Sequence, residues 1–183
     1  YDHARGALIG ERELIFPGTS LGLTEAPHLY KRDGRYYLLT AEGGTGWNHA
    51  VTMARSRSLN GPYELHPDTY ILSSRNRPDA PLQRAGHADL VETAEGETYM
   101  VYLCGRPLRN RGRCVLGRET AIQKMEWRDD GWLYTTDGEG APHLETPAPK
   151  PALPIPSGLN TRCRINSSHG LPAARSAMWP ATE

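Results

Sequence analysis

Short apolar runs separated by turn dipeptides recur along most of this chain, and they constrain its fold more than any other feature. Turn pairs such as Asp33-Gly34 and Glu95-Gly96 are typical of hairpins. Helical periodicity is scarce. The runs that we predict to be strands are 13–16, 29–31, 36–40, 50–55, 88–92, 98–103, 121–127 and 132–135. Many short strands at this spacing predict an all-β architecture.

A weak internal repeat sharpens this prediction. Residues 33–39 align with residues 95–101, and each segment is a polar turn followed by an apolar strand. Extending the alignment backwards sets Glu25 against His87, close to the start of a strand in each unit. The innermost strands of a propeller surround a central channel, so polar residues at equivalent places converge on one pocket. We therefore expect a partial β-propeller in which Glu25, His87 and Arg118 face one cavity.

Composition argues against several classes of partner. Lysine plus arginine number 21, as do aspartate plus glutamate, so no net charge favours nucleic acid or an anionic membrane. The cysteines Cys104, Cys114 and Cys163 lack metal-ligand spacing, and Cys104 in its apolar run is predicted to be a buried thiol. No apolar run approaches the ~20 residues that span a bilayer. We expect no metal and no cofactor.

The two ends of the chain differ from the strand-rich region. The amino terminus, from Tyr1 to Gly6, has neither a start methionine nor the apolar region of a signal peptide. We interpret it as a cut end, and the missing secretory signal favours a cytoplasmic location. Residues 1–145 are predicted to form the folded domain. Residues 146–183 begin with a proline-rich stretch and are predicted to be a linker and an irregular tail.

Two segments in the first half of the chain carry candidate functional residues. Glu25 is flanked by apolar residues before a strand, where partial desolvation would suit a general acid; a solvated loop glutamate is the alternative. The glycine-rich loop 43–49 ends in Trp47, Asn48 and His49. Its glycines allow a ligand to approach the backbone, and Trp47 and His49 can stack on or bond to a sugar. An ordinary hairpin loop is the alternative there.

Two further candidates lie in the second half. His87 stands among small residues at a strand start, and a satisfied core histidine is the alternative interpretation. Arg118 precedes another apolar run and can form paired hydrogen bonds to hydroxyls or a carboxylate. For its neighbour Glu119 we favour a salt bridge that ties two blades together.

Taken together, these segments resemble glycoside hydrolase family 43, whose members are five-bladed propellers that include β-xylosidases and α-L-arabinofuranosidases. The matching stretches are 23–31, 36–45, 48–56, 61–63, 85–91 and 116–123. Several long motifs in the right order are a specific signal. The resemblance implies a partial five-bladed propeller of about two and a half to three blades, followed by the irregular tail.

The family pattern uses a general base, a second aspartate that modulates the acid, and a general acid. The resemblance implies that Glu25 is the acid, that Arg118 contacts substrate hydroxyls and that His87 lies at the pocket floor. The loop with Trp47 and His49 would form the wall. Neither aspartate has a counterpart here, so the chain by itself is expected to be inactive.

The implied reaction is inverting hydrolysis of a small oligosaccharide of xylan or arabinan. One alternative is a carbohydrate-binding propeller without catalysis, which would use Trp47, His49 and Arg118. A second is a remnant that folds poorly, because missing blades leave open sheet edges.

Overall fold

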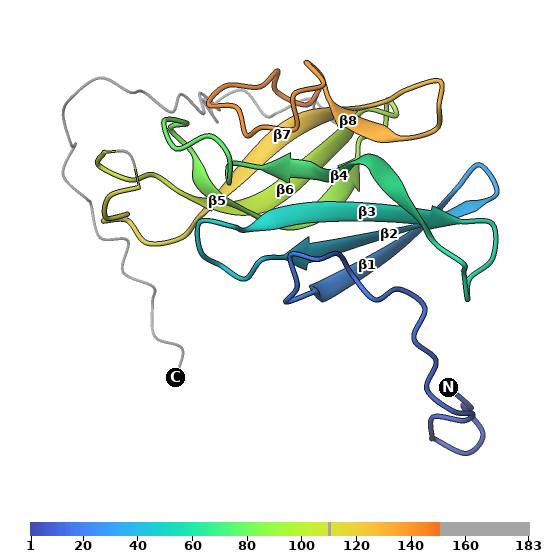
Figure 1. Ribbon diagram of the computed structural model, residues 1–183. Coiled ribbons are helices and arrows are strands. Elements are labelled where there is room, and N and C mark those ends of the chain that lie inside the picture. Colours follow the sequence, from blue (N-terminus) through green and yellow to red (C-terminus); the bar gives the residue numbers. More distant parts are fainter. Residues whose placement is uncertain (110, 151–183) are drawn as a thin grey trace, which may run out of the picture. The chain divides into compact units, whose positions relative to one another are not determined.

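Eight strands form two four-stranded antiparallel sheets in this computed structural model (Figure 1). The structure describes residues 1–109 and 111–150; the predicted irregular tail and most of the linker lie outside the described residues. The strands are β1 (Glu25–Arg32), β2 (Arg35–Glu42), β3 (Ala50–Ser56), β4 (Glu64–Ser73), β5 (Gln83–Glu92), β6 (Thr98–Gly105), β7 (Glu119–Trp127) and β8 (Leu133–Thr135). Each sheet is a simple meander, in the order β1-β2-β3-β4 or β5-β6-β7-β8. The all-β expectation is confirmed.

The strand predictions were wrong at two places. Residues 13–16 form no strand, and the region before Glu25 contains only an isolated bridge between Asp2 and Ala7. Strand β4 was missed because Pro67, which lacks an N–H, interrupts its apolar pattern. Its pairing with β3 shifts over that region. The described residues therefore contain two sheets where the sequence predicted two and a half to three units.

The first turn of each sheet explains the internal repeat. In the first sheet Arg32 pairs with Arg35 across a two-residue turn, and both turn residues have left-handed φ, as such hairpins require. In the second sheet the amide of Thr93 donates to the carbonyl of Glu97 at 2.9 Å, across three residues. The second sheet therefore has one more residue in this turn than the first.

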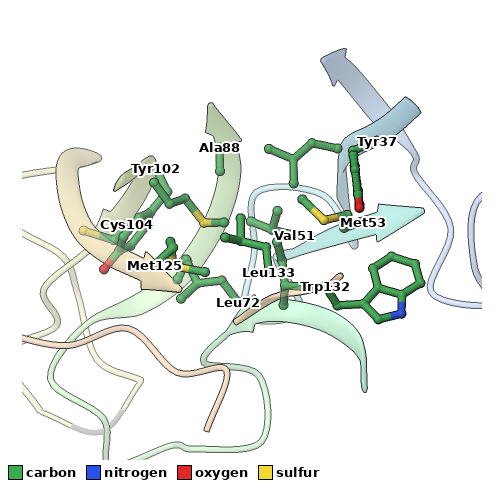
Figure 2. Close-up of a cluster of buried hydrophobic side chains, with 14 of the residues drawn as sticks. Tyr37, Val51, Met53, Leu72, Ala88, Tyr102, Cys104, Met125, Trp132 and Leu133 are labelled. Atoms are coloured by element: carbon green, nitrogen blue, oxygen red, sulfur yellow. The ribbon is translucent and has the colours of Figure 1, made fainter. Parts of the chain in front are cut away.

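The hydrophobic core lies between the two sheets. Val51 and Met53 of the first sheet belong to one buried cluster with Tyr102, Met125 and Leu133 of the second (Figure 2). Burying each such side chain stabilises the fold by about 1.5–3 kcal/mol. Cys104 is also buried and carries a free thiol, as predicted, and burial raises its pKa to about 11.

The first strands of the two sheets, β1 and β5, are joined by polar contacts. The hydroxyl of Tyr30 donates to the carboxylate of Asp89 and accepts from the amide of Leu90 at 3.0 Å. Arg32 reaches Glu92 at 3.5 Å. These contacts join the later part of β1 to the later part of β5. The described residues contain no helix long and apolar enough to cross a membrane.

Candidate active site

Strands β1 and β5 carry the same backbone irregularity near the point where each begins. In β1 the pairing with β2 shifts between Glu25 and His28. In β5 the pairing with β6 shifts twice, between Gln83 and Gly86 and again between Gly86 and Asp89, and the second shift, which we call the β5 bulge, corresponds to the shift in β1. Each shift is a β-bulge, with two residues on one strand opposite one on the partner. Bulges bend a strand and re-aim its side chains, and they are common beside active sites. The two bulges therefore mark corresponding places in the two sheets.

His87 corresponds to Ala26 rather than to Glu25, which corrects the alignment made from the sequence. Ala26 and His87 follow the first residue of their bulges and have left-handed φ angles of 49° and 53°. By the same register Glu25 corresponds to Gly86. The cause of the error is the longer turn of the second sheet, because an alignment fixed on β2 and β6 slips by one residue when it crosses that turn.

Glu25 and His87 are both exposed in the described structure. The expectation that Glu25 would be partly desolvated is wrong for this chain. His87 is not a satisfied core histidine either, since its side chain points out of the core. Both residues therefore present their functional groups to solvent at the bulged ends of β1 and β5.

Arg118 lies directly before β7 and is exposed. Its neighbour Glu119 accepts hydrogen bonds from Arg106, at 3.0 Å from Nε and 2.5 Å from Nη2. Arg106 follows β6, which pairs with β7 in one sheet. The prediction that Glu119 ties two blades together is therefore wrong: its salt bridge lies within one sheet. Arg118 takes no part in the salt bridge between Arg106 and Glu119.

The pKa of the buried His49 imidazole is shifted by its surroundings. Burial lowers the pKa of His49, and the charge of His87 and that of Arg118 lower it further. The backbone carbonyl of Arg84 and the carboxylate of Glu25 act in the opposite direction on the same pKa. Burial is the largest cause of this pKa shift, and the charges of Glu25, His87 and Arg118 act on it more weakly.

His49 itself is only 1% exposed, so the structure does not place it on an open wall. Its Nδ1 lies 3.1 Å from the carbonyl of Arg84 and must donate to it. Its ring packs on Gly86, where a Cβ would lie 2.6 Å from Cγ and Nε2 of the imidazole. His49 thus lies beneath β5, where it contacts Arg84 and Gly86.

Trp47 is half-buried in the loop between β2 and β3. The guanidinium of Arg84 lies 4.2 Å from the centre of its ring, and that of Arg111 lies 5.9 Å away. Cations at these distances are attracted to the face of an indole. The ring is therefore already in contact with protein cations, which limits the area that remains for a sugar.

Sequence reasoning passed over Glu42, which is fully buried at the end of β2. It accepts hydrogen bonds from the amide of Thr19 at 2.8 Å and from the hydroxyl of Thr24 at 3.2 Å. The hydroxyl of Thr19 also donates to it. An acidic residue that ends an apolar strand was the available signal, because a carboxylate is buried only where donors satisfy it.

Two cavities of the described residues are lined by residues other than the predicted ones. The larger one, of about 350 Å³, lies between β4 and β8 and includes Tyr70, Arg75, Tyr134 and Glu139 in its lining. Within residues 1–109 and 111–150, no group of three histidine, cysteine or acidic side chains is arranged to hold a metal ion. The chemistry available around His49 is that of an exposed carboxylate, an imidazole and a guanidinium.

Comparison with known proteins identifies the chain's relatives. The model of glycosyl hydrolases family 43 matches residues 1–133. Xylosidase/arabinosidase 43B of Humicola insolens is 61% identical over 138 residues, which cover 75% of this chain and 26% of that protein. A beta-xylosidase of Bacillus subtilis strain 168 is 49% identical over 157 residues, covering 81% and 29%.

A solved structure gives the same answer. The crystal structure of a xylan beta-1,4-xylosidase from Bacillus halodurans C-125 matches with a TM-score of 0.79 and 52% identity, over 85% of this chain and 30% of that one. Fold and sequence together define the class of protein to which this chain belongs. It belongs to glycosyl hydrolases family 43, which confirms the resemblance. The chain spans less than a third of the length of these relatives.

Proposed function

We propose that this chain is part of an enzyme that removes xylosyl or arabinofuranosyl units from short oligosaccharides of xylan, with Glu25 as the general acid. The observation that carries the proposal is the pair of corresponding bulges at which β1 and β5 present Glu25 and His87 to solvent. Relatives named xylosidase or arabinosidase support the substrate class. The whole protein would be a five-bladed propeller, to which the two sheets contribute two blades.

The proposed reaction is hydrolysis with inversion. Glu25 donates its proton to the departing glycosidic oxygen, while a general base activates water on the opposite face of the sugar. The two carboxyl groups stand ~6.5–9.5 Å apart to admit that water. Arg118 donates paired hydrogen bonds to sugar hydroxyls, and His87 forms the pocket floor. The base is supplied by an aspartate outside this chain.

The exposure of Glu25 fits this arrangement. In a complete propeller further blades would stand beside β1 and β5, and the exposed ends of these strands would face the central channel. Closure would remove water from around Glu25, which favours the protonated form that a general acid needs. A cytoplasmic location stays a prediction.

Substitution of Glu25 by Gln tests the proposal in an enzyme that carries this chain together with the base. General acid catalysis contributes roughly 10²–10⁴-fold in rate, so kcat/KM on xylobiose should fall by about that factor. The loss on an aryl xyloside should be much smaller, because an aryl leaving group hardly needs protonation. Glu95→Gln, in the exposed β5–β6 turn, is the matched control. Equal losses on both substrates would show that Glu25 is not the acid.

The 183-residue chain by itself should not turn over aryl xylosides, because it lacks the base that activates water. Turnover by the purified chain that disappears in Glu25→Ala would overturn this account. Binding of xylobiose by the wild-type chain, with no loss in Glu25→Ala, would instead favour the carbohydrate-binding alternative.

A further inference from the structure

Two buried polar side chains flank the loop between β2 and β3. Glu42 ends β2 and is 0% exposed; His49 directly precedes β3 and is 1% exposed. Glu42 pairs with Ala50, so these two point to one face of the sheet. Because side chains alternate along a strand, the neighbouring His49 points to the opposite face, towards β5. The two ends of one loop therefore reach two different parts of the molecule.

Glu42 holds the segment that leads into Glu25. Its carboxylate accepts hydrogen bonds from the backbone and hydroxyl of Thr19 and from the hydroxyl of Thr24, the residue directly before Glu25. The fit is tight, since a Cβ on Gly18 would collide with the Thr24 hydroxyl and lie 3.0 Å from Oε1 of Glu42. A buried carboxylate needs these donors, so the contact is expected to persist.

The backbone around Glu25 requires such a restraint. Leu23 and Ala26 on either side of it have left-handed φ angles of 54° and 49°. A residue with a side chain keeps this conformation only where its surroundings enforce it. The hydrogen bond from Thr24 to Glu42 supplies that restraint between the two strained residues.

His49 plays the equivalent part at the second bulge. Its Nδ1 donates to the carbonyl of Arg84 at 3.1 Å, and its ring fills the space that a side chain at position 86 would occupy. Arg84 and His87 have left-handed φ angles of 55° and 53°, the same pattern as around Glu25. His49 thus contacts the backbone at the left-handed Arg84 and at Gly86, the residue directly before His87.

We propose that Glu42 and His49 are positioning residues that hold the bulges of β1 and β5 from the two ends of one loop, and so fix where Glu25 stands relative to His87. Its consequence for catalysis rests on the proposed function. The restraint of the two bulges does not depend on the proposed function, so the positioning role and the proposed function can be refuted separately.

Amide hydrogen exchange in the 183-residue chain tests the restraint. Glu42→Leu should speed exchange at the β1 bulge by about tenfold and leave the β5 bulge unchanged, because only the first loses its hydrogen bonds. His49→Phe keeps an aromatic ring but removes the donor. It should speed exchange at the β5 bulge and leave exchange at the β1 bulge unchanged. Exchange that rises equally at both bulges in each variant would overturn the proposal, since that is the result of general destabilisation.

Conservative variants separate positioning from bulk. Glu42→Gln keeps an acceptor, and His49→Asn keeps an amide donor where Nδ1 stands, so each should return exchange to within about threefold of the wild type. His49→Gln, which places its donor near Nε2, should not. If Glu42→Leu fails to fold, Thr24→Val removes the same hydrogen bond from an exposed position and should loosen β1 alone. Unchanged exchange in Thr24→Val would refute the role of Glu42.

Kinetics in the completed enzyme give the catalytic readout. Glu42→Leu and His49→Phe should lower kcat about tenfold or more with KM nearly unchanged, because misplacement of catalytic groups affects mainly the transition state. The conservative variants should recover most of this loss. An inactive wild type combined with the expected exchange pattern would defeat the proposed function and leave the positioning role intact. Loss of selectivity in exchange would defeat the positioning role whatever the kinetics.

Discussion

The two sheets use one backbone device to present two different functional groups. Both first strands carry a bulge with a left-handed residue, at Ala26 in β1 and His87 in β5. In the first sheet the candidate side chain, Glu25, precedes the left-handed residue. In the second, the corresponding position is Gly86, and the candidate residue, His87, is itself the left-handed residue. A repeat of the backbone therefore does not imply a repeat of the chemistry.

The cause of the difference is the neighbour of each bulge. His49 comes from the first sheet and packs under β5, where it occupies the space that a side chain at position 86 would need. Glu25 is exposed, so no ring covers its bulge in the same way. The second sheet therefore has glycine, Gly86, at the position where the first sheet has Glu25, and the buried ring of His49 lies beneath it.

The largest effect is expected where the sheets share one core. Trp132 is buried beside β8 and packs against His66 of β4, with ring centres 4.9 Å apart. Trp132→Ala should cost about 3–5 kcal/mol of unfolding free energy. Urea unfolding should remain a single transition, because neither sheet has a core of its own. Two separate transitions would show that the sheets fold independently. Leu108→Ala, at a position 71% exposed, is the control.

Gly86→Ala tests the difference between the two bulges directly. The added methyl group meets the His49 ring beneath a fixed backbone, so the variant should lose about 1–3 kcal/mol. Gly46→Ala is the matched control, since a Cβ there meets nothing within 4 Å and neither glycine has a left-handed φ. The cost of Gly86→Ala should shrink in combination with His49→Ala. Full additivity of the two changes would mean that the ring is not what excludes a side chain.

Sequence reasoning found the all-β fold class, but not how the candidate segments contact one another. Turn pairs and apolar runs identified the hairpins, since these depend on neighbouring residues. Gly86 and Glu42 were not recognised, because their roles depend on His49 and Thr24, which are distant in the sequence and precede other strands. The equivalence of Glu25 and His87 failed by one residue because the length of the β5–β6 turn could not be read from the aligned strands.

Acidification should lower the free energy of unfolding through two buried histidines of the first sheet, His49 and His66. Burial lowers the pKa of His49 and that of His66, so the unfolded chain binds more protons than the folded one below about pH 6.5. The stability that comes from burying the two neutral histidines is fully present above about pH 6.5, and it is lost as the pH falls towards their folded-state pKa values. Each histidine contributes a slope of up to about 1.4 kcal/mol per pH unit.

Urea unfolding between pH 7.5 and 5 measures this slope. His66→Phe keeps an aromatic ring in the contact with Trp132 and should flatten the curve by the share of one histidine. His3→Gln, at an exposed position, should leave the curve unchanged. An equal slope in the wild type and His66→Phe would mean that His66 is protonated in the folded protein without cost.

The smallest effect concerns the turns, where the two sheets should behave alike. Gly34 and Gly96 have left-handed φ angles of 73° and 79°, and a Cβ on either meets nothing within 4 Å. Alanine at each position therefore adds only backbone strain, of about 1 kcal/mol. Asparagine, which tolerates this conformation better, should cost less than alanine at both. The unfolding free energies of the four variants give the measurement. If Gly96→Ala costs clearly less than Gly34→Ala, the extra residue in the β5–β6 turn relaxes the strain, and the two turns are not equivalent.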